Sequence, residues 1–156
     1  MNITRNPPEA TTKQLLIEAQ LPVKDITPEH LEHFFGAWSG TRLDGVVGLE
    51  LYQSVALLRS LAVITARQRS GLGAALVSEA ERYAAEQGTR SLFLLTTTAK
   101  NYFEQRGYLS ISRASAPKAI RATAEFSSIC PASAVFMVKH IPANPALAIT
   151  ERDRHA

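Results

Sequence analysis

Apolar residues gather in short runs that predict the strands of a sheet in the middle and the last third of the chain. Continuous apolar or β-branched runs bounded by turn residues are typical of buried strands. The pattern predicts one strand within 36–47 and further strands over 46–52, 55–64, 91–96, 108–113 and 133–140. Leu43-Asp44-Gly45 is the predicted turn between the first two strands.

Apolar residues three and four positions apart predict helices between these strands. The clearest spans 72–87, where one face holds Leu72, Ala75, Leu76, Ala80, Tyr83 and Ala84. Gly88 is placed to end this helix, as glycine commonly does. Thr27 and Pro28 favour a helix start, because threonine caps a first turn and proline fits its first position. The predicted shorter helices cover 11–19, 28–35, 99–106 and 117–124.

The order of these elements predicts one mixed α+β domain. A strand at 55–64, a helix at 72–87 and a strand at 91–96 imply a right-handed crossover between two parallel strands. The domain is expected to cover 1–140, followed by a proline-containing, charged C-terminal tail over 141–156.

Composition narrows the class of protein. The chain has 156 residues, a formal net charge of +3 and one cysteine, which excludes an internal disulfide and gives no metal cluster. No apolar run reaches membrane-spanning length and the N-terminus lacks the apolar core of a signal peptide, so we expect a cytoplasmic protein without a membrane partner. Lysine and arginine form no dense cluster, which disfavours a nucleic-acid partner.

A glycine-punctuated segment between the strand at 55–64 and the helix at 72–87 carries the strongest chemical signal. It reads Gln68, Arg69, Ser70, Gly71, Leu72, Gly73 and Ala74. Free backbone N–H groups and the helix dipole make such a helix start an anion site. The glycines let a phosphate approach the backbone, and Gln68, Arg69 and Ser70 add donors.

This segment resembles the acetyl-CoA pyrophosphate loop of the GNAT acetyltransferases, and 94–108 resembles a second segment of that family. The resemblance implies the GNAT fold, a mostly antiparallel sheet with one splayed parallel strand pair, with acetyl-CoA as co-substrate. A homodimer is possible because the family often dimerises. The implied acetyl-CoA contacts are Leu61, Ala62, Val63, the loop residues Gln68 to Ala74, Thr96, Asn101 and Phe103. Backbone N–H groups of 61–63 would hold the pantetheine and polarise the thioester carbonyl.

Two positions depart from the family pattern. Phe103 stands where many members carry a tyrosine that protonates the CoA thiolate, and Thr96 where many carry asparagine. Phenylalanine cannot donate a proton, so either Tyr102 acts as the general acid or water does, and Tyr102 alternatively packs in the core or a dimer. These departures also keep open a non-catalytic CoA-binding module.

The stretches 113–117 and 123–137 resemble a narrower group, the small acetyltransferases encoded with arsenic-resistance genes, which are similar to short amino-acid N-acetyltransferases. This resemblance implies a small-molecule amine acceptor, an acidic amino acid. An arsenic-containing glutamate analogue such as arsinothricin comes first, with phosphinothricin and glutamate as alternatives.

Four residues are candidates for binding and activating this acceptor. Arg59 suits a bidentate pair with the acceptor carboxylate; the alternatives are an ion pair with Glu50 and simple exposure at the sheet face. Glu50 is the candidate general base, and a surface or ion-paired glutamate is equally consistent with its position. Arg113 is a candidate for a second acidic group, and Cys130 for packing beside the acceptor.

Overall fold

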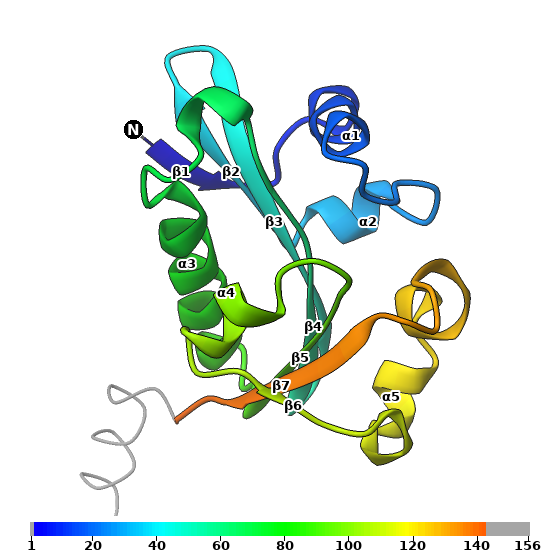
Figure 1. Ribbon diagram of the computed structural model, residues 1–156. Coiled ribbons are helices and arrows are strands. Elements are labelled where there is room, and N and C mark those ends of the chain that lie inside the picture. The colour runs from blue at the N-terminus through cyan, green and yellow to red at the C-terminus, as the bar shows by residue number, and fades with distance from the viewer. Residues whose placement is uncertain (1, 143–156) are drawn as a thin grey trace, which may run out of the picture.

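The computed structural model describes residues 2–142 of the chain (Figure 1). Within these residues seven strands form one sheet in the order β1-β2-β3-β4-β5-β7-β6. The strands are β1 (Asn2–Arg5), β2 (Phe34–Ser39), β3 (Arg42–Tyr52), β4 (Val55–Val63), β5 (Ser91–Thr96), β6 (Leu109–Ser110) and β7 (Val135–His140). Neighbouring strands are antiparallel except β4 and β5. The predicted mixed α+β sheet with one parallel pair is confirmed.

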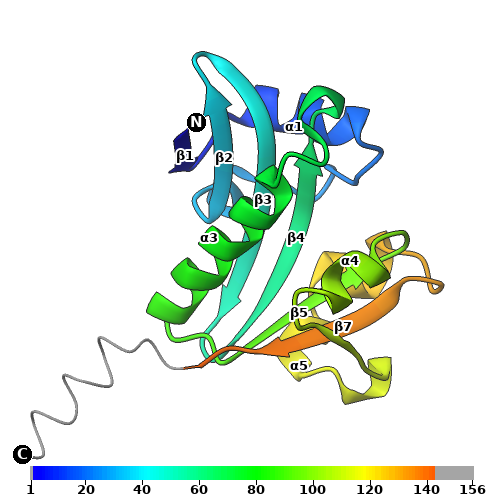
Figure 2. The same ribbon diagram turned by 60° about the vertical axis from the view of Figure 1, so that its left-hand side comes forward.

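Helices cover both faces of this sheet. The α-helices are α1 (Glu9–Glu18), α2 (Pro28–Leu31), α3 (Leu72–Glu86), α4 (Lys100–Glu104) and α5 (Lys118–Arg121). Helices α3 and α4 lie on one face, and α1, α2 and α5 lie on the other (Figures 1 and 2). None of the helices in residues 2–142 has both the length and the apolar character needed to cross a membrane.

Two predictions for the N-terminal third were wrong, and one strand there was missed. Strand β1 was not predicted, and the helix expected to reach residue 35 ends at Leu31, after which β2 begins at Phe34. The predicted turn residues 43–45 lie inside β3, and the chain instead reverses between Ser39 and Arg42. Burial in the sheet explains why the helix ends before residue 35, because Phe34 is fully buried and packs against helix α1.

Differences near the C-terminus are differences of length. The strand predicted over 108–113 is only the two residues of β6. The helix predicted over 117–124 is the single turn of α5, followed by a π-helical turn, Glu125–Ile129, that the sequence did not indicate. Ile141, expected in the tail, packs into the core, and the rest of the predicted tail, from residue 143, lies outside the described residues.

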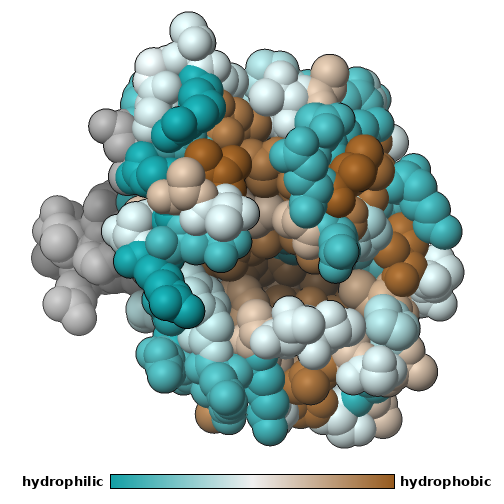
Figure 3. All heavy atoms as spheres, turned by 45° about the horizontal axis from the view of Figure 1, so that its top comes forward, coloured by the Kyte–Doolittle hydropathy of each residue, from teal (hydrophilic) through white to brown (hydrophobic). Residues whose placement is uncertain are grey.

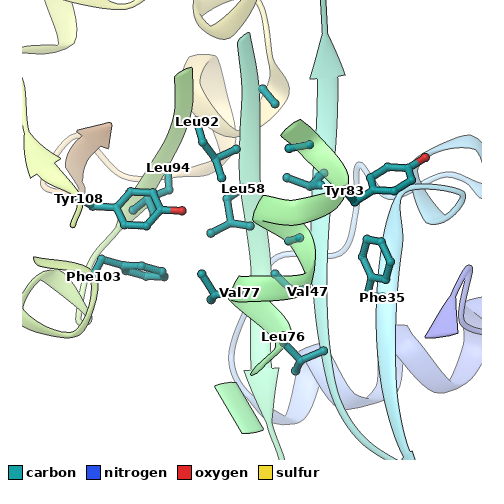
Figure 4. Packing of buried hydrophobic residues seen from close by; sticks show 14 of the residues in the cluster. Phe35, Val47, Leu58, Leu76, Val77, Tyr83, Leu92, Leu94, Phe103 and Tyr108 are labelled. Carbon is teal, nitrogen blue, oxygen red and sulfur yellow. The ribbon is translucent and has the colours of Figure 1, made fainter. Parts of the chain in front are cut away.

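The largest core lies between the sheet and helix α3. Leu76 and Val77 project from α3 toward Val47 of β3 and Leu58 of β4, and the Tyr83 ring packs against Phe35 of β2 with ring centroids 5.3 Å apart (Figure 4). Phe103 and Tyr108 extend this core under α4, with ring centroids 5.4 Å apart. This packing fixes the start of α3 against β4 and therefore the loop that joins them.

The feature that positions the site is the separation of β4 from β5. The two strands pair only over three residues, from Val55 opposite Ser91 to Leu57 opposite Phe93, and then diverge (Figure 2). Beyond these pairs, β4 carries a bulge opposite Val47, where Ser60 adopts a positive φ of 58°. A bulge bends its strand away from a regular ladder. The splay predicted from the family resemblance is therefore present, and the bulge supplies its local cause.

Candidate active site

A cavity of about 590 Å³ fills the gap between the diverging strands. We call it the inner cavity; it is lined by residues of β4 and β5, the loop before α4, and residues Glu125 and 129–131 of the C-terminal segment. A second hollow, of about 660 Å³, lies over the start of α3, and we call it the loop-side hollow. Leu61, Thr98 and Ala99 line both, so the two spaces meet. Figure 3 shows a depression with apolar walls and a polar rim on one end of the molecule.

The loop-side hollow contains the predicted anion loop. Gln68, Arg69, Gly71, Gly73 and Ala74 line it, together with the β4 residues Leu61, Ala62 and Val63. Gly71 precedes helix α3 with a φ of 86°, a backbone conformation that glycine adopts without strain. This turn leaves the first N–H groups of α3 without helical partners. The geometry is that of an anion site.

Two predicted loop residues contribute differently from what their side chains suggested. The Leu72 side chain is buried in the core, so only its backbone can face the hollow. The Ser70 hydroxyl donates to the carbonyl oxygen of Arg67, and this hydrogen bond stabilises the turn. The anion-binding capacity of the loop therefore rests mainly on backbone N–H groups.

Two arginines that the sequence analysis missed also line the loop-side hollow. Arg67 Nη1 donates to Asp44 Oδ2 at 2.9 Å, and hydrogen bonding from Arg42 lowers the pKa of Asp44 to about 2. Arg106 lies with its guanidinium carbon 3.6 Å from the ring centroid of Tyr102. Together with Arg69 they give this hollow three cationic side chains, a charge suited to a polyanion.

Tyr102 faces the loop-side hollow, and its hydroxyl lies against Gly73 of the anion loop. The hydroxyl oxygen is buried and has no hydrogen-bond partner among the described residues, as is also true of Arg106 Nε. Burial raises the pKa of Tyr102. An unpartnered buried hydroxyl beside an anion loop is suited to donate a hydrogen bond to a bound group.

We expect Tyr102→Phe to weaken acetyl-CoA binding roughly 2- to 10-fold, the range for one hydrogen bond of about 0.5 to 1.5 kcal/mol. The reason is the position of the hydroxyl over Gly73. Steady-state kinetics with varied acetyl-CoA would measure this as a raised KM. A large fall in kcat with unchanged KM would instead assign Tyr102 as the general acid.

The inner cavity has two charged side chains among the described residues that line it, Arg59 and Glu125. Arg59 is 3% exposed and is held by carboxylates on several sides. Its Nη1 donates to Asp25 Oδ2 at 2.5 Å and to Glu50 Oε2 at 2.7 Å, and its Nη2 donates to Asp25 Oδ1 at 2.9 Å. Burial disfavours the charged guanidinium, but these partners outweigh it and raise the pKa of Arg59.

Glu50 lies behind Arg59 rather than in the cavity wall. One oxygen accepts from Arg59, and the other accepts from the Tyr52 hydroxyl at 2.5 Å. The ion pair that the sequence left as an alternative is therefore present, and both carboxylate oxygens of Glu50 are occupied. Glu50 as general base stays a prediction that this geometry does not favour.

Sequence reasoning missed two members of the charged cluster, Asp25 and Glu125. Asp25 lies in the loop before α2, where no pattern marks it. Glu125 begins the π-helical turn, is 5% exposed, and its Oε1 lies 3.5 Å from Arg59 Nη2. An acidic residue inside an otherwise apolar and small-residue segment was the available signal.

Some of the remaining predicted residues line the inner cavity and others do not. Cys130 lines it, and burial raises the pKa of the thiol to about 11. Arg113 Nη2 donates to the carbonyl oxygens of Pro131 and Ala134, each at 3.0 Å, so it links two residues that line the cavity without lining it itself. Thr96 and Phe103 line the cavity, whereas Asn101, exposed in the first turn of α4, is among the lining residues of neither space.

Comparison with known proteins agrees with this architecture. The profile of the Acetyltransferase (GNAT) family matches residues 4–108. An uncharacterised N-acetyltransferase of Chlorobaculum tepidum is 32% identical over 93 residues, which are 59% of this chain and 59% of that protein. The chain thus spans less than two thirds of that relative.

Solved structures share the fold at low sequence identity. N-acetylglutamate synthase of Neisseria gonorrhoeae, complexed with coenzyme A and N-acetyl-glutamate, superposes with a TM-score of 0.75 at 18% identity, over 90% of this chain and 35% of that one. The Mycobacterium tuberculosis protein Rv2747, complexed with CoA, gives 0.73 at 17% identity, over 91% of this chain and 100% of that one.

These findings define the class of protein. A splayed parallel strand pair, a glycine loop at the start of α3 and a family profile over most of the chain agree with one another. The chain belongs to the GNAT acetyltransferase family.

Proposed function

We propose that this protein transfers the acetyl group of acetyl-CoA to the α-amine of a small amino acid of the glutamate type. The observation that carries the amino-acid class is the pairing of Arg59 with Glu125 in the wall of the inner cavity. An amino acid carries an ammonium and a carboxylate close together, which matches the one anion and the one cation in the lining; Asp25 and Glu50 hold the same guanidinium from outside the lining.

The two connected spaces divide the task between cofactor and acceptor. The polyphosphate of CoA would lie on the backbone N–H groups of the loop 68–74, with Arg67, Arg69 and Arg106 adding positive charge. The pantetheine would follow 61–63 toward the junction at Leu61 and Ala99, which line both spaces. The acceptor amine would meet the thioester there, so that acetyl passes directly between them.

The proposed acceptor subclass is an acidic amino acid, with an arsenic-containing glutamate analogue as the first candidate and phosphinothricin and glutamate as the others. Supporting observations are the sequence likeness of 113–137 and the fold shared with N-acetylglutamate synthase. Arg113, which donates to the carbonyl oxygens of two residues in the cavity lining, is the proposed cation for a second acidic group.

A non-catalytic CoA-binding module is the rival function, and specific residues favour it. Phe103 is buried against Tyr102 and Tyr108 and has no proton to donate. The Thr96 hydroxyl oxygen accepts a hydrogen bond from the Ala99 N–H at 3.0 Å. Such a module would bind acetyl-CoA without turnover. Acetyl transfer would require water or Tyr102 to protonate the departing thiolate.

A thiol-release assay with acetyl-CoA separates these functions. The acceptor panel holds arsinothricin, phosphinothricin, glutamate, glutamine, glycine and ethanolamine, so that each charged group is removed in turn. Turnover on the first three well above ethanolamine supports the proposal, and preference among them fixes the acceptor. Binding of acetyl-CoA by calorimetry with no turnover on any amine supports the rival.

The proposal also includes a cytoplasmic location and a homodimeric assembly. Use of acetyl-CoA and a single unpaired cysteine, Cys130, support a cytoplasmic protein. The homodimer is proposed because members of the family often dimerise, and sedimentation velocity of the purified chain would give its mass in solution.

A further inference from the structure

We propose that Glu125 is the catalytic base, whose carboxylate removes the proton from the acceptor ammonium inside the inner cavity. This inference rests on the proposed function, because it concerns the same acetyl transfer. It gives Glu125 the role predicted for Glu50, which lies in the strand before the cofactor strand.

Position separates Glu125 from the other carboxylates of the cluster. Glu125 lines the inner cavity, whereas Asp25 and Glu50 contact Arg59 from the protein side. Its closest ion-pair contact, 3.5 Å to Arg59 Nη2, is the longest of the Arg59 carboxylate contacts. Glu125 therefore keeps acceptor capacity toward the cavity that its neighbours have already used on Arg59 and Tyr52.

The local fold holds Glu125 in this position. Its backbone carbonyl accepts from Cys130 N at 2.9 Å, which closes the π-helical turn. Thr123 supports the same turn, because its hydroxyl accepts from Phe126 N at 3.3 Å. Such π-helical turns are rare and occur frequently at functional sites.

The surrounding charges suit a base that works near neutral pH. Burial raises the pKa of Glu125 to about 7, with Arg59 acting in the opposite direction and Asp25 and Glu50 adding to the rise. The other titratable groups near the cluster are Tyr52 and His30 beside Glu50, and the Cys130 thiol, whose pKa is raised. A base with a pKa near the working pH combines a useful ionised fraction with a real affinity for a proton.

Glu125 takes one proton from the ammonium, and the freed nitrogen lone pair attacks the thioester carbonyl carbon. The C–N bond forms and the C–S bond breaks, while the second proton of the nitrogen goes to the departing thiolate through water or Tyr102. The products are the acetylated amine and CoA thiol, and Glu125 releases its proton to water.

The test compares matched glutamate-to-glutamine variants in the full chain with acetyl-CoA and glutamate or arsinothricin. Glu125→Gln is expected to lower kcat/KM roughly 10²- to 10⁴-fold, the range for loss of a general base, and to abolish the acidic limb of the pH profile near neutrality. The Kd for acetyl-CoA should stay within about twofold. Glu50→Gln should keep the acidic limb, and Glu104→Gln, an exposed residue of α4, should keep both rate and limb.

A second acceptor series makes the result specific for proton removal. Hydroxylamine and hydrazine have lower amine pKa values than an α-amino acid, so less of each amine needs deprotonation. The Glu125→Gln defect is therefore expected to shrink with these amines. A defect of equal size for all amines would reduce Glu125 to a structural residue and overturn the proposal, as would retention of the acidic limb.

Two further experiments cover a Glu125→Gln variant that does not fold and a wild-type chain that shows no activity. If Glu125→Gln does not fold, Glu125→Asp keeps the carboxylate, and an unaltered rate with the shorter side chain would overturn the assignment. If the wild-type chain acetylates no amine, the proposed function fails by itself. Carbon NMR of labelled glutamate side chains with added glycine then tests Glu125: a shifted carboxyl resonance supports contact with an amine, and an unchanged one overturns it.

Discussion

Replacing Arg59 with alanine is expected to lower the free energy of unfolding by about 3 to 5 kcal/mol, the range for breaking a buried ion pair from one side. Arg59 is the cation at the centre of three carboxylates, those of Asp25, Glu50 and Glu125. Its side chain is fully buried, and that of Glu50 is only 5% exposed. Removing the guanidinium leaves three carboxylates together without a cation, on side chains that are at most 11% exposed.

Chemical denaturation at neutral pH measures this loss, and a variant with the whole cluster neutralised identifies its cause. The quadruple variant Arg59→Leu, Asp25→Asn, Glu50→Gln and Glu125→Gln removes the whole cluster. It should recover part of the stability, because it leaves no uncompensated charge buried. Equal instability of the two variants would mean that Arg59 acts through packing instead of charge.

Arg59→Ala should also affect the two substrates unequally below its unfolding temperature. The KM for the amino-acid acceptor is expected to rise strongly, since the inner cavity loses its cation, while acetyl-CoA affinity changes little. Separate titrations of each ligand measure this difference. Similar losses for both ligands would contradict a role for Arg59 in acceptor binding.

The second large effect is expected at Gly71, where alanine should weaken acetyl-CoA binding by up to about tenfold. A residue with a side chain in this left-handed conformation costs roughly 1 to 2 kcal/mol, and 1.4 kcal/mol corresponds to tenfold in affinity. If the turn relaxes to avoid this cost, the backbone N–H groups at the start of α3 turn away from the phosphates. Binding must then restore the strained turn.

Gly40 provides the matched control for this substitution. It has a φ of 61° in the turn between β2 and β3, and an added Cβ meets nothing within 4 Å, as at Gly71. Gly40→Ala should therefore cost similar stability without changing acetyl-CoA affinity. Isothermal titration of both variants checks this, and an equal loss of affinity would show that general destabilisation is the cause.

The anion loop shows what local patterns can predict. Gly71, Gly73 and the apolar face of 72–87 required only turn and helix chemistry, and the structure places them where that chemistry implies. The N-terminal strands were harder. Phe34 and Phe35 lie three and four positions after Leu31, which is the spacing of a helix face. Only their pairing with β3 decides that they form a strand.

The sequence by itself determined the parallel crossover, the glycine loop, the main helix and the family, because these depend on periodicity and on contacts between near neighbours. Only the tertiary structure decided the acceptor side of the site. Arg59 meets Asp25, 34 positions earlier, and Glu125 lies on a segment after β6. Such pairings depend on the bulge at Ser60 and the divergence of β4 from β5, which bring distant segments together without a local signature.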